Sequence, residues 1–160
     1  MTCYCGSTQH YQQCCQPFIE GNLTPSTPEQ LMRSRYSAYA TKNCQYIFNT
    51  YAQAVQKENS LNDIAQWAEQ TQWLALIVKQ ACSSTLTSFD PNNPPTVSFD
   101  AFYQQDKQFY KMSECSRFIV ENNQWRYLNG DVEDHLLITS PKRNDSCFCG
   151  SGKKFKKCCG

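Results

Sequence analysis

The sequence predicts an α+β protein in which helices come first and an antiparallel sheet follows, with a small cysteine-rich module at each end. Apolar residues recur at helical spacing up to residue 68, and from residue 97 onward they alternate with more polar ones. Four cysteines lie within thirteen residues near each end. We therefore expect modules over residues 1–21 and 141–160 and a middle domain over residues 22–140, because 160 residues suffice for one ordinary domain with appendages.

Three helices are expected at the start of the middle domain. The first begins at Pro28, where Thr27 can serve as N-cap and Gln30 can complete a capping box. Its buried stripe consists of Met32, Tyr36, Tyr39 and Ala40. The apolar residues of a short second helix are Ile47, Phe48 and Tyr51. A third helix starts after Ser60, which can act as its cap, and it presents Leu61, Ile64, Ala65 and Ala68.

The strands are expected after residue 72. Residues 73–78 are apolar and partly β-branched, which favours a buried strand, although periodicity alone does not exclude a helix. Residues 97–103 and 110–120 alternate in polarity, as strands with one buried face do. Asn122 and Asn123 can supply the positive φ angles of a tight hairpin turn before a returning strand over residues 125–129.

Both cysteine modules follow one spacing: Cys, one residue, Cys, eight residues, Cys-Cys. The second copy lies 144 positions after the first, and the Gly and Ser that follow the first pair are also repeated. The spacing therefore marks an internal repeat. Its members are Cys3, Cys5, Cys14 and Cys15 in the first copy and Cys147, Cys149, Cys158 and Cys159 in the second.

Four converging thiolates are the usual donor set of a structural zinc site, and two zinc sites are therefore expected. Iron also accepts four thiolates, so the sequence alone leaves the metal open. Redox-active dithiols and structural disulfides are the alternatives, and adjacent cysteines pair with each other only under strain. A module of this length buries too little apolar surface to fold alone, so bound metal would supply its folding free energy. The remaining cysteines lack such spacing and are expected in the core: Cys44, Cys82 and Cys115.

Only the C-terminal module is basic. Its lysines are Lys153, Lys154, Lys156 and Lys157, whereas the first eighteen residues carry no lysine or arginine. A zinc ion with four thiolates has a formal charge of −2, which these lysines can offset. They can also contact an acidic partner such as RNA or an acidic protein surface. The N-terminal copy would have to hold its metal without cationic help, and we expect it to be structural and packed close to the core.

The C-terminal module resembles the SEC-C motif, the zinc-binding tail of the bacterial preprotein translocase motor. Further blocks occur in order along the chain: C-Y-C-G-S, L-M-R-S-R-Y-S-A-Y, T-Q-W-L-A-L, E-C-S-R-F and E-N-N-Q-W-R-Y-L-N-G. Together they resemble the bacterial YchJ family over essentially the whole chain. The resemblance implies a SEC-C module at each end and a cone-shaped middle domain similar to nuclear transport factor 2. It also implies docking of the basic module to a ribosome or to a chaperone or export protein.

Cone folds of this kind often enclose a pocket. The polar candidates for such a site are Arg33, Arg35, Tyr36, Tyr39, Glu114, Arg117, Tyr127 and Asp131. We expect the two helix arginines to face solvent and the tyrosines to lie in the core. Glu114 shares a strand face with apolar residues, so it needs a partner if buried, and Arg35 is the candidate. A structural ion pair and a ligand-binding or acid–base role are both open for Glu114.

No catalytic motif is visible, and neither His10 nor His135 is assigned a role, so enzymatic activity is left open and binding is favoured. The net charge of +1 gives no reason to expect specific DNA or membrane binding. No signal peptide or membrane-spanning segment is expected, and many free cysteines suit the reducing cytoplasm. The leading hypothesis is a metal-binding protein that docks through its C-terminal module. The alternative is a small-molecule-binding or enzymatic cone domain with a pocket near Arg35 and Glu114.

Overall fold

A curved antiparallel sheet forms the centre of the molecule in the computed structural model, which describes residues 2–160. Residue 1 of the expected N-terminal module lies outside the described part. The four strands pair in sequence order, β1-β2-β3-β4, so β1 and β4 are the edges. They are β1 (Gln72–Ala81), β2 (Thr96–Gln105), β3 (Gln108–Glu121) and β4 (Gln124–Ile138). The predicted helices-then-meander order of an α+β domain is confirmed.

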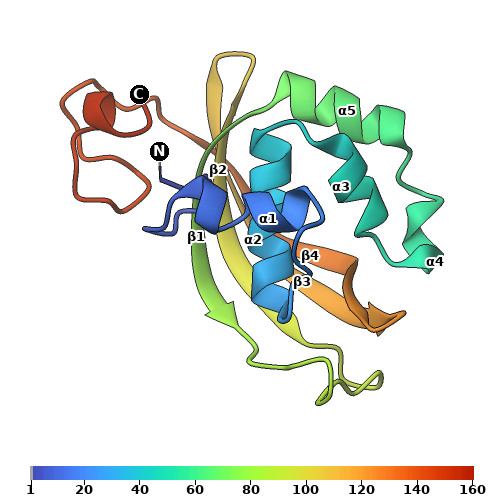
Figure 1. Ribbon diagram of the computed structural model, residues 1–160. Coiled ribbons are helices and arrows are strands. Elements are labelled where there is room, and N and C mark those ends of the chain that lie inside the picture. The colour runs from blue at the N-terminus through green and yellow to red at the C-terminus, as the bar shows by residue number, and fades with distance from the viewer. Residues whose placement is uncertain (1) are drawn as a thin grey trace.

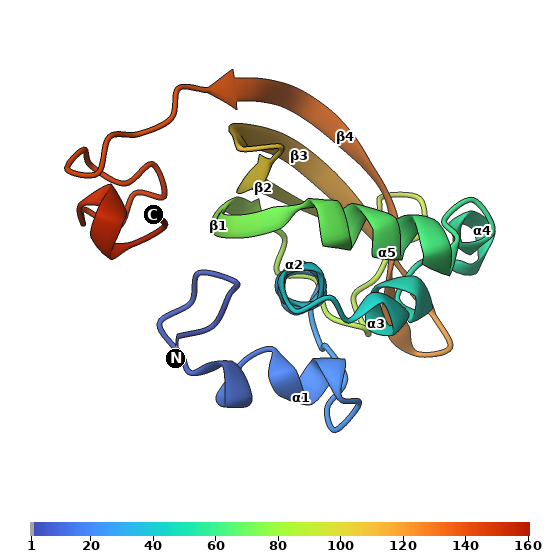
Figure 2. The same ribbon diagram turned by 90° about the horizontal axis from the view of Figure 1, so that it is seen from above.

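The helices lie on the concave side of this sheet, and the sheet arches over α2 when seen from above (Figure 1, Figure 2). Their bounds are α1 (Gln16–Ile19), α2 (Pro28–Ala40), α3 (Cys44–Asn49), α4 (Gln53–Gln56) and α5 (Leu61–Gln70). Helix α2 contacts β1, β2 and β4, and it therefore forms the central support of the curved sheet. Both cysteine modules lie at the same end of the molecule, toward β1 (Figure 1, Figure 2).

The predicted local signals are confirmed where a side chain satisfies a backbone group. The Thr27 hydroxyl accepts a hydrogen bond from the Gln30 amide at the start of α2, and Ser60 does the same for Asp63 at the start of α5. Asn122 has φ 51° in the hairpin between β3 and β4, and its neighbour has φ 57°. These caps and turns depend only on nearby residues, which is why the sequence indicates them clearly.

Two short α-helices and the second half of β4 were not predictable from the sequence. Helices α1 and α4 have four residues each, too few to show a periodic apolar stripe. Strand β4 continues to Ile138, nine residues beyond the predicted end at Asn129. Most of that extension is exposed at the sheet edge, and its side chains therefore lack the alternation that marks a half-buried strand.

The main core lies between α2 and the sheet, and it includes the N-terminal cysteines. Leu31, Val97 and Phe118 are fully buried there, together with Trp125, whose indole donates to the Ser26 carbonyl. A smaller cluster joins Phe109 of β3 to the C-terminal module. The two modules are thus packed against the middle domain in different ways.

The three cysteines outside the modules do not lie in the core as predicted. Cys82 is exposed, and Cys44 and Cys115 are only partly buried. Cys82 directly follows the last residue of β1, where the chain leaves the sheet. Cys44 is the first residue of α3. Position at the end of an element, rather than residue type, sets the exposure of these two side chains.

Candidate metal centres

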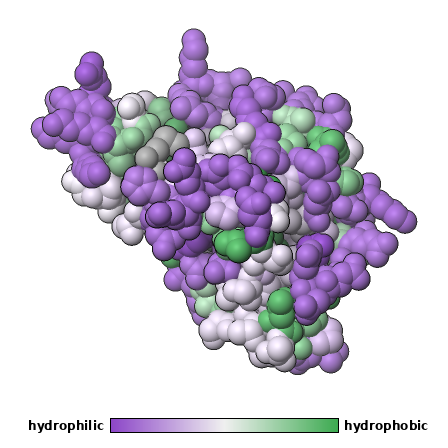
Figure 3. Space-filling model, viewed as in Figure 1, coloured by the Kyte–Doolittle hydropathy of each residue, from purple (hydrophilic) through white to green (hydrophobic). Residues whose placement is uncertain are grey.

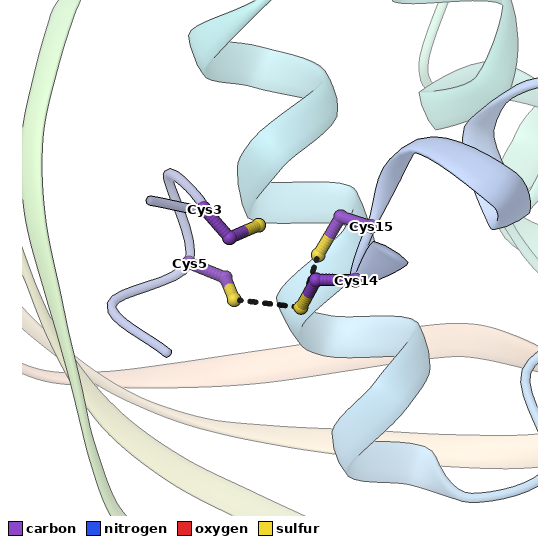
Figure 4. A group of neighbouring side chains, drawn as sticks. All are labelled: Cys3, Cys5, Cys14 and Cys15. Atoms are coloured by element: carbon purple, nitrogen blue, oxygen red, sulfur yellow. Dashed lines mark hydrogen bonds between the residues drawn. The ribbon is translucent and has the colours of Figure 1, made fainter. Parts of the chain in front are cut away.

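Four side chains of the N-terminal module point toward a common space (Figure 4). Cys3 and Cys5 come from a tight turn, and Cys14 and Cys15 follow a short 3-10 helix over Tyr11–Gln13. A bridge between Thr2 and His10 closes the loop that separates the two pairs. As a result, the four sulfur atoms all lie within 4.8 Å of one another.

The C-terminal module repeats this local structure. A bridge joins Ser146 to Lys154, a 3-10 helix spans Phe155–Lys157, and the four sulfur atoms again lie within 4.8 Å of one another. Each element stands 144 positions after its N-terminal counterpart. The glycines after the first cysteine pairs also match, with φ 78° at Gly6 and 76° at Gly150. The sequence repeat is therefore a structural repeat.

The sulfur spacing fits a tetrahedral metal ion. Zinc–sulfur bonds of about 2.3 Å place the sulfurs of a tetrahedral site about 3.8 Å apart. The Cys14 sulfur lies 3.7 Å from that of Cys5 and 3.9 Å from that of Cys15. In the second cluster the Cys158 sulfur lies 3.4 Å from that of Cys149 and 3.8 Å from that of Cys159. All eleven cysteines are free thiols, so the donor set is available to a metal.

A serine hydroxyl supports each cluster at the same place. Ser7 Oγ lies 3.2 Å from the Cys14 sulfur, and Ser151 Oγ lies 3.2 Å from the Cys158 sulfur. Hydrogen bonds of this kind orient metal ligands and stabilise their charge. The sequence comparison of the two modules had shown the repeated serine, but only the structure shows its contact with a ligand.

The surrounding protein groups make one cysteine of each cluster easier to ionise than the others. Hydrogen bonds from Cys15 and Cys3 lower the pKa of Cys5, whereas burial raises the pKa of Cys14 to about 11. Burial also opposes ionisation of Cys149, but hydrogen bonds from Ser151 and Cys147 outweigh it and lower its pKa to about 7. Four thiolates in such a space repel one another, so a divalent cation is the natural counter-charge.

The N-terminal cluster is built into the core, as expected. Cys3, Cys5 and Cys15 are at most 5% exposed and pack with Leu31 and Met32 of α2. The prediction that this copy has no cationic help was wrong. Arg33 Nη1 of α2 donates a 2.8 Å hydrogen bond to the carbonyl oxygen of Cys5, which places a positive charge beside the cluster.

Arg33 is also held from its own helix, because its Nε donates to the Glu29 carboxylate at 2.8 Å. Burial lowers the pKa of Arg33, but the hydrogen bond and charge of Glu29 outweigh it and raise the pKa above its usual value. The side chain is half-buried and does not face solvent freely. Ser37 of the same helix contacts the Cys3 sulfur at 3.7 Å. Neither contact could be inferred from spacing, because α2 is remote from the cysteines in sequence.

The C-terminal cluster is more open. Cys147 is buried, whereas Cys158 is exposed. Phe148 stacks on Phe102 of β2 with ring centroids 5.0 Å apart, and Phe155 contacts Phe109 of β3 edge-on. Aromatic contacts therefore fix the module to the end of the sheet and leave its outer side in solvent.

The basic residues of this module lie on that outer side. Lys153, Lys154, Lys156 and Lys157 are all exposed. Among residues 2–160, none of these four lysines forms an ion pair. In the space-filling view the projecting end of the molecule that carries this module is largely hydrophilic (Figure 3). The lysines are thus free to meet another molecule.

Comparison with protein families assigns the two recognisable parts. Residues 27–130 match the model described as YchJ, middle NTF2-like domain, and residues 143–160 match the SEC-C motif. The chain belongs to the YchJ family. A UPF0225 protein of Vibrio cholerae is 41% identical over 160 residues, covering all of both chains. One from Vibrio parahaemolyticus is 38% identical and covers 99% of this chain and 98% of its own.

Two solved structures share the fold of this YchJ-family chain. The solution structure of a SEC-C motif containing protein from Rhodopseudomonas palustris has a TM-score of 0.73 at 29% identity. It covers 84% of this chain and 100% of its own. The crystal structure of a SEC-C motif containing protein from Psychrobacter arcticus has a TM-score of 0.68 at 30% identity, covering 100% and 96%. The predicted NTF2-like fold with cysteine clusters at both ends is therefore confirmed.

The middle-domain candidates separate into two groups. A cavity of about 300 Å³ inside the curve of the sheet is lined by Arg35, Tyr36, Tyr39, Glu114 and Tyr127. Arg117 and Asp131 instead form an ion pair at the surface, 2.5 Å apart. His135 lies 2.5 Å from the Tyr103 hydroxyl and remains without an assigned role.

Two expectations about Arg35 were wrong. It does not face solvent, being 6% exposed, and it forms no ion pair with Glu114 within residues 2–160. Its guanidinium lies over the rings of Tyr51 and Tyr127, 4.3 and 4.7 Å from their centroids. Trp67, Trp73 and Met112 also lie in the cavity wall, and nothing in the sequence indicates this because their helix and strands meet only after folding.

Across residues 2–160, no helix is both long enough and apolar enough to cross a lipid bilayer.

Proposed function

We propose that this chain binds two zinc ions and uses its basic C-terminal SEC-C module to dock to the ribosome through exposed RNA. The N-terminal module is the structural partner, built into the core of the NTF2-like domain. A cytoplasmic location is part of the proposal, and eleven free cysteines suit that reducing compartment. The observation that carries the proposal is that one metal module has four exposed lysines without an ion pair in residues 2–160, whereas the other module has no lysine.

The net charge of the module distinguishes two explanations for these lysines: they offset the charge of the metal site, or they bind an acidic partner. A zinc tetrathiolate has a formal charge of −2, and two cations would neutralise it. Residues 141–160 carry six basic side chains and one acidic side chain, so the module remains positive after metal binding. The N-terminal cluster, with the same four thiolates, is supported by a single nearby arginine. Charge compensation therefore accounts for only part of the lysine content, and the surplus favours an anionic partner.

RNA is the preferred partner because exposed lysines on a small module suit phosphate contacts, which need no matching protein surface. Binding through Lys153, Lys154, Lys156 and Lys157 should weaken steeply as salt rises. The slope of log K against log salt concentration is expected to be about −0.7 to −0.9 per phosphate contact. An acidic chaperone or export protein is the competing partner, and its capture without ribosomes would replace the RNA assignment.

The test compares two charge-reversal variants by co-sedimentation with ribosomes over a salt series. The double variant Lys156→Glu and Lys157→Glu should bind at least about tenfold more weakly at physiological salt and show a shallower salt slope. The matched control is Lys57→Glu with Lys107→Glu, which changes net charge equally at exposed lysines of the middle domain.

Metal content must be measured in both variants, because the altered lysines lie next to ligands. Equal metal content with selective loss of ribosome binding supports docking through the module. Equal weakening by the control would show that only net charge matters. Unchanged binding of the Lys156 and Lys157 variant would overturn the docking proposal while leaving the metal sites untouched.

A further inference from the structure

The cavity inside the curved sheet has the features of a ligand site. Its volume of about 300 Å³ is at the lower end of the range for small-molecule pockets. Aromatic side chains from both helices and strands line it, among them Tyr36 and Tyr39 of α2, Trp67 of α5 and Trp73 of β1. Flat aromatic walls favour a flat occupant of one or two rings, because such a ligand can stack against them.

Arg35 supplies donors to the floor of this cavity. Its Nη1 atom donates to the Ile47 carbonyl at 2.8 Å and to Thr50 Oγ1 at 2.7 Å, and these bonds fix the guanidinium. Within residues 2–160, its Nε and Nη2 atoms have no hydrogen-bond acceptor. The guanidinium is therefore held in place and retains N–H groups for an acceptor on a ligand.

Glu114 supplies the matching acceptor. Its Oε1 atom accepts hydrogen bonds from Ser116 at 2.6 Å and from the Tyr127 hydroxyl at 3.0 Å, whereas Oε2 accepts none within residues 2–160. Gly130 on the neighbouring strand leaves room for this arrangement, because a Cβ there would overlap the carboxylate. The carboxylate is thus fixed through one oxygen and open through the other.

Charge then selects the ligand class. The cavity contains one buried cation, Arg35, and one carboxylate, Glu114, so its formal charge is balanced before a ligand enters. An anionic ligand would meet Glu114 and a cationic ligand would meet Arg35, each in a site of low dielectric where an unmatched charge is costly. An uncharged ligand with an acceptor beside a donor satisfies both groups without adding charge.

From these observations we infer that the cavity binds a flat, uncharged molecule with a carboxamide or lactam edge. Its carbonyl oxygen accepts from the free N–H groups of Arg35, and its N–H donates to Oε2 of Glu114. The ring stacks among the tyrosine and tryptophan side chains. This site is independent of the two cysteine clusters and adds a small-molecule binding function to the chain.

Three isosteric probes test the charge argument: benzamide, benzoate and benzamidine, which are neutral, anionic and cationic at pH 7. Met32 and Met112 line the cavity and are two of the chain's three methionines. Methyl-labelled methionine therefore gives a simple NMR spectrum in which both cavity signals can be followed. Titration to about 10 mM covers the affinities expected of fragments of this size.

Benzamide is expected to shift both cavity methionine signals and to bind at least about tenfold more tightly than either charged probe. Glu114→Gln keeps the side-chain shape but leaves Arg35 unmatched, so benzoate should become the tightest of the three. Glu121→Gln is the matched control on the same strand, since the Glu121 carboxylate accepts from the Gln53 amide and lies outside the cavity lining. The Glu121→Gln variant should bind the three probes in the same order of affinity as the unmodified protein.

The order of the three probes on the unmodified protein decides the proposal even if Glu114→Gln does not fold. Absence of any cavity methionine shift up to the highest concentration would overturn it. So would equal or tighter binding of benzoate or benzamidine to the unmodified protein. A change of order in Glu121→Gln as large as that in Glu114→Gln would also overturn it, because the effect would then not belong to the cavity.

Discussion

At the scale of single residues, Gly6 shows how the N-terminal module is tied to the sheet. Its φ of 78° lies in the left-handed region, and a Cβ would stand 2.7 Å from the carbonyl oxygen of Leu76 on β1. The sequence shows the glycine as part of the repeat, and a residue without a Cβ suits a sharp turn after the first cysteine pair. The sequence could not predict the second reason for glycine, which is the close approach of a strand about seventy residues later.

Gly6→Ala should therefore lower the free energy of unfolding more than Gly→Ala does at a position that has the same positive φ but no close neighbour. Gly21 is the control, with φ 77° and nothing within 4 Å of an added Cβ. Gly21→Ala should lower the free energy of unfolding by about 1–2 kcal/mol. Gly6→Ala should cost a further 1–3 kcal/mol or so, because the neighbouring backbone must move.

Denaturant unfolding of the metal-loaded protein measures both changes. Equal destabilisation of the two variants would show that the contact with Leu76 is not tight, and that the glycine serves only the turn.

The ligands themselves are the residues best predicted from the sequence, since their spacing repeats. The residues that contact and support these ligands could not be predicted in the same way. Arg33 and Ser37 reach the N-terminal cluster because α2 packs beside it, and their own neighbours in sequence give no sign of that contact. Charged residues on helices are usually exposed, which is why the sequence favours solvent for Arg35, but two tyrosine rings, the Ile47 carbonyl and the Thr50 hydroxyl surround it here.

At the scale of elements, β1 is an edge strand that both modules contact. The Leu74 carbonyl oxygen lies 3.6 Å from the sulfur of Cys159, and the Leu76 carbonyl lies against the turn at Gly6. Gly150 of the second module lies near the Ile77 side chain. Edge strands with free backbone groups invite pairing with other chains, so the two modules also protect this edge.

The outer face of the sheet carries a charged cluster around Asp100 of β2. The carboxylate accepts from Ser113 at 2.6 Å and lies 3.1 Å from Lys79 and 3.0 Å from Lys111. Burial raises the pKa of Asp100, but Ser113 and the two lysines outweigh it and hold the pKa below its ordinary value. The stabilisation is therefore present above the unfolded pKa of about 4 and is lost as pH falls through the folded pKa.

Asp100→Asn should remove part of the loss of stability below about pH 4, since the uncharged side chain does not titrate. Thermal unfolding across a pH series measures this effect. Asp131→Asn is the control, because the exposed ion pair of Asp131 with Arg117 contributes little to the free energy of unfolding. Identical pH profiles for the unmodified protein and the Asp100 variant would show that the three-strand cluster does not stabilise the fold.

Elements with local signals were predictable, namely the capped helices, the asparagine hairpin and the alternating strands. Elements whose residues lack such local signals could not be predicted from the sequence. Helices α1 and α4 are single turns stabilised by packing, and the outer part of β4 is held by its hydrogen-bonded pairing with β3. Their positions follow from tertiary contacts, which a single sequence does not display.

At the scale of the whole molecule, one small motif occurs twice in two different surroundings. The N-terminal copy shares the main core with α2, whereas the C-terminal copy is fixed to the end of the sheet by aromatic contacts. The lysine difference in the sequence predicted this contrast in burial. Where each copy packs, and that both contact β1, required the folded structure.

The number of metal ions bound to each chain tests the central claim most directly. Elemental analysis should be made on protein isolated from its native organism, without added metal or chelator. Two clusters of four free thiols at tetrahedral spacing predict two zinc ions per chain. Fewer than one metal ion per chain would contradict the account of both modules.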